Sequence, residues 1–220
     1  MLFDLDGTLI DSAPDIAAAV NELLARRDLG PLSLADVTSM IGRGVEKLVE
    51  RAFAATGNPL SPAELRREHA EMMDIYARHL TGATTLMPGA GQMLEELCDE
   101  GVALGLVTNK PQRFIETILD FFHLSSVFAV AIGGDSGVAK KPAPDMLLAA
   151  MEELGAEPRN TIMVGDSTSD VEAARAAGVQ VVLVRGGYSV EPIDRLGADR
   201  VIDGLSSLSG ALPALKPPIL

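Results

Sequence analysis

The sequence has little cysteine, few basic residues and no long apolar run, and each shortage excludes a class of protein. Cys98 is the only cysteine in 220 residues, which excludes an internal disulfide framework and a zinc site built from several cysteines. A membrane-spanning helix needs about 20 apolar residues, whereas the longest uncharged run, residues 79–94, is shorter and is interrupted by Gly, Thr and Pro. The chain also opens with acidic residues, unlike a signal peptide. We therefore expect a soluble, cytoplasmic protein with no membrane partner.

Acidic residues dominate the charge of the chain. The sequence contains 31 Asp and Glu against 18 Lys and Arg, a formal net charge of −13. Such a surface repels the phosphates of nucleic acids, so we expect no nucleic-acid partner. Disorder is also excluded, because hydrophobic residues make up 47% of the chain and are numerous enough to form a core.

The apolar periodicity divides the chain into a helical stretch and an alternating stretch. Residues 13–86 are helical almost throughout, with Ser12, Ser33 and Ser61 at positions that favour helix starts. From residue 87 onward, short apolar strands alternate with amphipathic helices, a pattern typical of a parallel sheet covered on both faces. Residues 2–9 are predicted to form a short apolar strand that runs into a turn at Asp6-Gly7-Thr8. The other predicted strands are residues 102–107, 127–132, 161–164, 180–184 and 199–202, and the predicted helices between them are residues 89–100, 111–122, 144–154 and 170–177.

These elements predict an α/β fold: a doubly wound parallel-sheet, Rossmann-like core with an inserted all-helical cap domain. The core consists of residues 1–12 and 87–220, the cap of residues 13–86, and residues from about 212 to 220 form a frayed tail. Only three residues precede Asp4, fewer than the usual 5–6 or so of a strand. Either the natural chain starts upstream or the first strand is unusually short.

Polar residues follow four of the predicted strands. They are Asp4 and Asp6 at the C-terminal end of the first strand, Thr108 and Asn109 at the end of the second, Lys141 after the third, and Asp166 and Asp170 after the fourth. In an open parallel sheet the ligand crevice lies at the carboxyl ends of the strands. Any one of these residues could serve only in a turn or a helix cap, but the convergence of four distant segments on one edge predicts a functional site.

This arrangement resembles the haloacid dehalogenase superfamily of aspartate-nucleophile phosphatases. The matching segments are Asp4-Leu-Asp6-Gly-Thr8, Thr108, Lys141, and Gly165-Asp166 with Asp170, in that order. The resemblance covers essentially the whole chain, including a helical cap between the first and second motifs. It implies an enzyme, a Mg²⁺-dependent hydrolase of phosphomonoesters that acts through an aspartyl-phosphate intermediate and binds a small phosphorylated metabolite.

The resemblance also implies a role for each motif residue. Asp4 is the nucleophile, and Asp6 is the general acid and later the base for water. Mg²⁺ is held by the Asp4 side chain, the Asp6 backbone carbonyl and Asp166, and Asp170 orients the metal site. Thr108 hydrogen-bonds a phosphoryl oxygen and Lys141 supplies a fixed positive charge. Lys141 fits the pattern better than its neighbour Lys140 because it directly precedes Pro142.

Two features of the motifs favour a phosphatase over its relatives. Dehalogenases lack the second aspartate of the first motif, which is present here as Asp6. β-Phosphoglucomutase-like members usually carry Glu-Asp-Ser at the fourth motif, where this chain has Gly165-Asp166-Ser167. A phosphotransferase of that kind and a non-catalytic metabolite-binding relative remain alternatives.

Several segments, some of them outside the catalytic motifs, resemble bacterial phosphoglycolate phosphatases. These segments include Ile41-Gly-Arg-Gly, Val107-Thr-Asn-Lys-Pro111, Ile132-Gly-Gly-Asp135 and Gly187-Tyr-Ser. The resemblance implies 2-phosphoglycolate as the substrate; pyrophosphate and sugar phosphates are the alternatives. Arg43, Lys47 and Asn109 are candidate substrate-binding residues, the first two at a helix start that suits an anion or that is simply solvated. The oligomeric state is monomer or homodimer.

The acidity of the chain has a local consequence. At least four carboxylates, Asp4, Asp6, Asp166 and Asp170, would crowd one crevice and raise one another's pKa. A divalent cation and Lys141 would reverse this repulsion, so we expect strict metal dependence. By contrast Cys98, on the apolar stripe of a predicted helix, is expected to be packed and inert.

Overall fold

The computed structural model of the chain describes residues 1–212, so residues 213–220 of the predicted tail lie outside the described residues. The chain forms two compact units. The first, here called the core unit, comprises Met1–Asp11 and the chain from Leu86 onward; the second, the helical unit, comprises Ser12–Thr85. Within residues 1–212 no helix has the length and apolarity that a membrane span requires.

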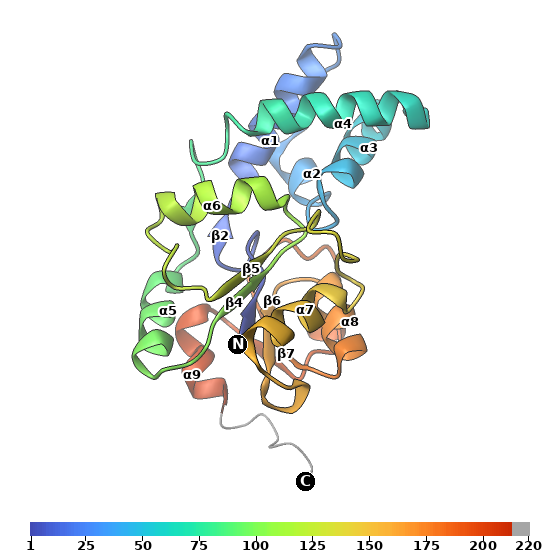
Figure 1. Cartoon of the computed structure of the whole chain (residues 1–220). Coiled ribbons are helices and arrows are strands. Elements are labelled where there is room, and N and C mark those ends of the chain that lie inside the picture. Colours follow the sequence, from blue (N-terminus) through green and yellow to red (C-terminus); the bar gives the residue numbers. More distant parts are fainter. Residues whose placement is uncertain (213–220) are drawn as a thin grey trace. The chain divides into compact units, whose positions relative to one another are not determined.

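The core unit is built on a six-stranded sheet (Figure 1). Its order is β5-β4-β1-β6-β7-β8, and every neighbouring pair is parallel. The strands are β1 Leu2–Phe3, β4 Gly105–Val107, β5 Val130–Ile132, β6 Ile162–Gly165, β7 Gln180–Val184 and β8 Arg200–Ile202. The helices of this unit are α5 Ala90–Asp99, α6 Gln112–Phe121, α7 Asp145–Leu154, α8 Thr168–Ala177 and α9 Leu208–Ala211. The predicted α/β class with a parallel sheet is confirmed.

Helices cover both faces of this sheet. Leu2 of β1, Met163 of β6 and Leu183 of β7 share one core with residues of α7 and α8. Because side chains alternate along a strand, Phe3 and Val164 point to the opposite face, and they are also fully buried. In Figure 1, α5 and α9 lie on one side of the sheet and α7 and α8 on the other. Burial on both faces explains why the strands read as continuous apolar runs.

The helical unit, Ser12–Thr85, contains four helices, in agreement with the helical pattern expected of residues 13–86. They are α1 Ala13–Ala25, α2 Leu34–Thr38, α3 Val45–Ala55 and α4 Pro62–Tyr76. Ser33 and Ser61 each form a capping box, with Asp36 and Glu64 respectively. Ser12 also precedes its helix, but its side chain makes no capping hydrogen bond.

The structure differs from the sequence-based expectations in several places. The first strand comprises only Leu2 and Phe3, shorter than a usual strand. In the turn after it, the backbone N–H groups of Thr8, Leu9 and Ile10 all donate to the Leu5 carbonyl. Two short strands that were not expected, β2 Ile10–Asp11 and β3 Thr85–Leu86, pair with each other. Cys98 is exposed rather than packed, which corrects that expectation.

Candidate active site

Three candidate residues each come directly after a strand. Asp4 follows β1, Thr108 follows β4 and Asp166 follows β6. Strands β4 and β6 flank β1 in parallel register, with Phe3 of β1 opposite both Leu106 and Val164. The three strands therefore end within one residue of one another, and the Asp4 backbone N–H donates to the Val164 carbonyl at 2.9 Å. This is the edge at which the sequence predicts a site.

Three buried carboxylates gather at this edge. Asp4, Asp166 and Asp170 each offer an oxygen within 4.8 Å of the others. The ammonium of Lys141 lies 2.9 Å from Asp4 Oδ1 and 2.7 Å from Asp170 Oδ1, and its side chain is 1% exposed. When all three carboxylates are ionised, the group formed with the Lys141 ammonium has a net charge of −2 in a buried place. Carboxylate oxygens are ligands that suit a hard divalent cation.

The protonation of this cluster depends first on burial. Burial raises the pKa of Asp4 to about 7, since the attraction of Lys141 does not outweigh it and Asp170 adds a like charge. Burial, followed by Asp170 and Asp4, raises the pKa of Asp166 well above its ordinary value. Burial alone would lower the pKa of Lys141, but Asp170 and Asp4 raise it above its usual range. The direction agrees with the expected crowding of acids, but burial rather than mutual repulsion is the largest cause.

Neighbouring residues fix the position of Asp166. Thr8 Oγ1 donates to Asp166 Oδ1 at 3.3 Å, and the Tyr188 backbone N–H donates to Asp166 Oδ2 at 2.5 Å. A Cβ at Gly7 would lie 2.5 Å from Asp166 Oδ2, and one at Gly187 would lie 2.4 Å from Asp166 Cβ. The two glycines therefore leave the space that this carboxylate occupies.

Asp170 is held on both of its oxygens. Its Oδ1 accepts from Lys141 Nζ, and its Oδ2 accepts from the backbone N–H and the hydroxyl of Ser167 at 3.0 and 2.7 Å. Ser167 and Asp170 thereby form a capping box at the start of α8. A Cβ at Gly165 would lie 2.3 Å from Asp170 Cγ. The Gly-Asp-Ser-x-x-Asp segment thus builds a helix start that carries one carboxylate toward Lys141.

Asp6 has a partner that the sequence reasoning did not single out. Lys110 Nζ donates to Asp6 Oδ1 at 2.7 Å, and the side chains of the two residues are 2% and 12% exposed. Because lysine is rarely buried, a buried lysine was not expected as the partner of Asp6. The place of Lys110 two residues after Thr108, at the end of β4, was the available signal.

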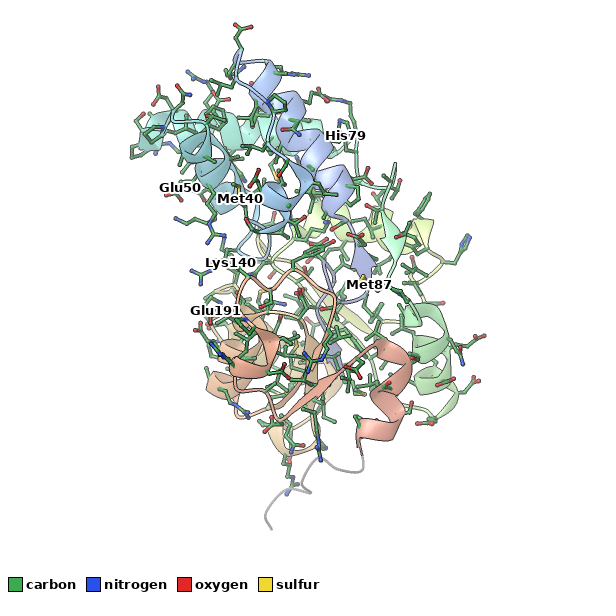
Figure 2. All side chains as sticks on the ribbon, turned by 180° about the vertical axis from the view of Figure 1, so that it is seen from behind. Met40, Glu50, His79, Met87, Lys140 and Glu191 are labelled. Atoms are coloured by element: carbon green, nitrogen blue, oxygen red, sulfur yellow. The ribbon has the colours of Figure 1, made fainter. Side chains whose placement is uncertain are left out.

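The segments after β4 and β5 are joined to each other. Asn109 is buried, and its Nδ2 donates to the backbone carbonyl of Lys141 at 2.8 Å. The Gly134 backbone N–H donates to the Lys110 carbonyl at 2.8 Å, and Asp135 Oδ1 accepts from the Gln112 backbone N–H, at the start of α6. These bonds bring Lys141 into the cluster, whereas Lys140 is exposed on the surface of the loop (Figure 2).

The remaining two candidates lie in the helical unit. Arg43 is exposed in the turn between α2 and α3. Lys47 is in the first turn of α3, where its ammonium lies 2.6 Å from Glu50 Oε2. The core unit therefore brings together all the candidates except Arg43 and Lys47.

Comparison with known proteins agrees with this geometry. A family model described as haloacid dehalogenase-like hydrolase matches residues 1–184, which include every motif residue at the sheet edge. The chain belongs to this family. The prediction of an enzyme, a phosphatase-like hydrolase of this family, is confirmed.

Similar proteins of the haloacid dehalogenase-like family include named phosphatases. The phosphoglycolate phosphatase of Caulobacter vibrioides is 40% identical over 200 residues, which cover 91% of this chain and 84% of that protein. The phosphoglycolate phosphatase of Pseudomonas putida is 41% identical over 221 residues, covering 99% and 80%. A crystal structure described as a predicted phosphoglycolate phosphatase from Haemophilus somnus 129pt superposes with a TM-score of 0.90 at 31% identity and covers 96% of each chain.

Proposed function

We propose that this haloacid dehalogenase-like hydrolase is a Mg²⁺-dependent phosphomonoesterase that converts 2-phosphoglycolate and water to glycolate and phosphate. The observation that carries the chemistry is the buried group of Asp4, Asp166 and Asp170 around the ammonium of Lys141. A nucleophilic carboxylate beside a phosphate dianion requires positive charge close by; the ammonium of Lys141 provides part of it, and a bound divalent cation would provide the rest.

The residues fit a divalent cation. Asp4 and Asp166 would hold Mg²⁺ through their carboxylates and Asp6 through its backbone carbonyl. By the family resemblance Asp170 would orient the site, with its Oδ1 on Lys141 Nζ and its Oδ2 on Ser167 at the start of α8. When bound, the ion would supply the charge that offsets the carboxylates and the incoming phosphate.

Asp4 and Asp6 would share the two chemical steps. In the first, a carboxylate oxygen of Asp4 bonds to phosphorus while the bond from phosphorus to the glycolate oxygen breaks, and Asp6 donates its proton to that oxygen. In the second, Asp6 takes a proton from water, the water oxygen bonds to phosphorus, and the bond to Asp4 breaks. Phosphate leaves and both aspartates return to their starting state.

Two further residues would bind the transferred phosphoryl group. Lys141 stays charged beside Asp4, since its pKa is raised by Asp170 and Asp4 despite its burial. The hydroxyl of Thr108, directly after β4, would donate to a phosphoryl oxygen. Both groups are held in place before the substrate binds, which favours stabilisation of the transition state.

The choice of 2-phosphoglycolate rests on the relatives that are named phosphoglycolate phosphatases at about 40% identity. The helical unit would serve as the cap, as its position between the first two motifs suggests. Arg43 and Lys47, near the start of α3, would be its candidate groups for the carboxylate of the substrate.

The test is a phosphate-release screen of the purified protein with Mg²⁺ and with EDTA. We expect 2-phosphoglycolate to be hydrolysed with the highest kcat/KM, glycolate to appear in equal amount, and EDTA to stop the reaction until Mg²⁺ is restored. A preference for pyrophosphate or a sugar phosphate would overturn the assignment of 2-phosphoglycolate as the substrate but would leave the proposed chemistry intact. Transfer of phosphate to a sugar would indicate a phosphotransferase, and no turnover of any phosphate ester would overturn the proposal.

A further inference from the structure

The loop that follows β7 packs directly on Asp166. This loop contains Gly187 and Tyr188, part of a segment that the catalytic motifs do not explain. The Tyr188 backbone N–H donates to Asp166 Oδ2 at 2.5 Å. At Gly187, even a Cβ atom would lie 2.4 Å from Asp166 Cβ. The position of this loop therefore sets the position of the carboxylate.

The side chain of the same tyrosine makes a second connection. Tyr188 Oη donates to Asp11 Oδ1 at 2.7 Å. Asp11 is the last residue of the core unit on this segment, and Ser12 begins the helical unit. Tyr188 thus binds Asp166 through its backbone and, through its phenol, the segment that leads into the helical unit.

We propose that Tyr188 is a positioning residue for Asp166 and that its hydrogen bond to Asp11 makes metal binding depend on the segment that enters the helical unit. The proposal rests on the proposed function, in which Asp166 holds Mg²⁺. The Tyr188 N–H, at 2.5 Å from Asp166 Oδ2, is closer to this carboxylate than the Thr8 hydroxyl, at 3.3 Å from Oδ1. Loss of the phenol anchor would let the loop move and would leave Oδ2 less well oriented for a metal.

The test measures Mg²⁺ binding by calorimetry on the full chain without substrate. Tyr188→Phe removes only the hydroxyl, and Asp11→Ala removes its acceptor. We expect each to weaken Mg²⁺ binding roughly 2- to 10-fold, the effect of one hydrogen bond. The double variant should be no weaker than either single variant, because both remove the same link. Asp11→Asn keeps an acceptor oxygen and should bind Mg²⁺ nearly as the natural chain does.

A second readout separates positioning from general loosening of the fold. In Tyr188→Phe the Mg²⁺ concentration that gives half-maximal activity should rise by the same factor, and kcat at saturating Mg²⁺ should return to the natural value. Tyr76→Phe, which removes the hydroxyl of the other tyrosine, in α4 of the helical unit, is the matched control and should leave Mg²⁺ binding unchanged.

Three results would overturn the inference: Tyr188→Phe with unchanged Mg²⁺ affinity, an equal loss in Tyr76→Phe, or additive losses in the double variant. These differ from a failure of the proposed function, in which the natural chain itself would neither bind Mg²⁺ nor hydrolyse a phosphate ester. In that case the inference fails together with its premise.

Discussion

Lys110 Nζ lies 2.7 Å from Asp6 Oδ1, in a place where neither side chain is more than 12% exposed. Asp6 follows β1 and Lys110 follows β4, so the pair joins two adjacent strand ends. An ion pair so little exposed fixes both groups, because removal of either partner would leave a buried charge without compensation. Lys110 therefore determines where the proposed acid–base carboxylate lies.

Lys110→Met should lower kcat about 10- to 100-fold, because Asp6 loses the group that holds it. This is less than the roughly 10²- to 10⁴-fold expected when an acid–base group is removed altogether. Steady-state phosphate release gives kcat and KM. The control is Lys140→Met, at an exposed lysine, which should retain the natural kcat. Equal kcat values in the two variants would show that Lys110 does not position Asp6.

Asp4→Asn should abolish turnover, because an amide cannot form the phosphorylated intermediate. The side chain keeps nearly the same shape, and Lys141 keeps its ion pair with Asp170 at 2.7 Å, so the fold should persist. Phosphate release and circular dichroism together separate the two effects. Asp36→Asn, at an exposed helix cap, is a control that should remain active. If the Asp4→Asn variant kept normal phosphatase activity, Asp4 would not be the nucleophile.

The sequence predicted which residues of the candidate site lie close together where the ends of the strands determine their positions. Asp4, Thr108 and Asp166 each come directly after a strand, and parallel strands end at a common edge, so their proximity follows from the order of elements. The helix starts at Ser33 and Ser61 were predictable for a similar reason, since a capping box lies within four consecutive residues.

Contacts between distant side chains were not predictable in this way. The bond from Tyr188 to Asp11 joins residues 177 positions apart, and the burial of Lys110 depends on the packing of loops around it. Cys98 shows that even within a single helix the apolar stripe does not predict the burial of every residue. Its neighbours Leu94 and Leu97 are buried, but Cys98 lies just beyond the edge of that stripe and is exposed.

Gly187→Ala should weaken Mg²⁺ binding about 10- to 100-fold, the usual cost of disturbing the support of a metal ligand. The new Cβ would lie 2.4 Å from Asp166 Cβ and Oδ2, so the carboxylate or the loop must move. Gly204→Ala is the matched control, since Gly204 has extended backbone with φ of −177° and no heavy atom within 4 Å of the added Cβ. Calorimetric titration with Mg²⁺ compares the two. Unchanged affinity in Gly187→Ala would mean that the close packing of Gly187 on Asp166 does not control metal binding.

Mg²⁺ binding should also become tighter as the pH rises toward 7. Burial, with Asp170 adding to it, raises the pKa of Asp4 to about 7 in the metal-free chain, whereas an aspartate in an unfolded chain titrates near 3.9 or so. Between these values the folded chain holds a proton that the unfolded chain has released. The contribution of Asp4 to the stability of the metal-free protein therefore falls as the pH rises from about 4 to about 7.

Magnesium competes with that proton, so its binding must release it wherever Asp4 is protonated. Calorimetry in two buffers of different ionisation enthalpy counts the protons released. We expect more release at about pH 6 than at about pH 8, and affinity that rises between them and then levels off. Asp4→Asn should lose the part of this release that belongs to Asp4, whereas Asp36→Asn should keep it. Equal proton release at both pH values would mean that Asp4 is already ionised in the metal-free protein, and Lys141 rather than burial would then govern its charge.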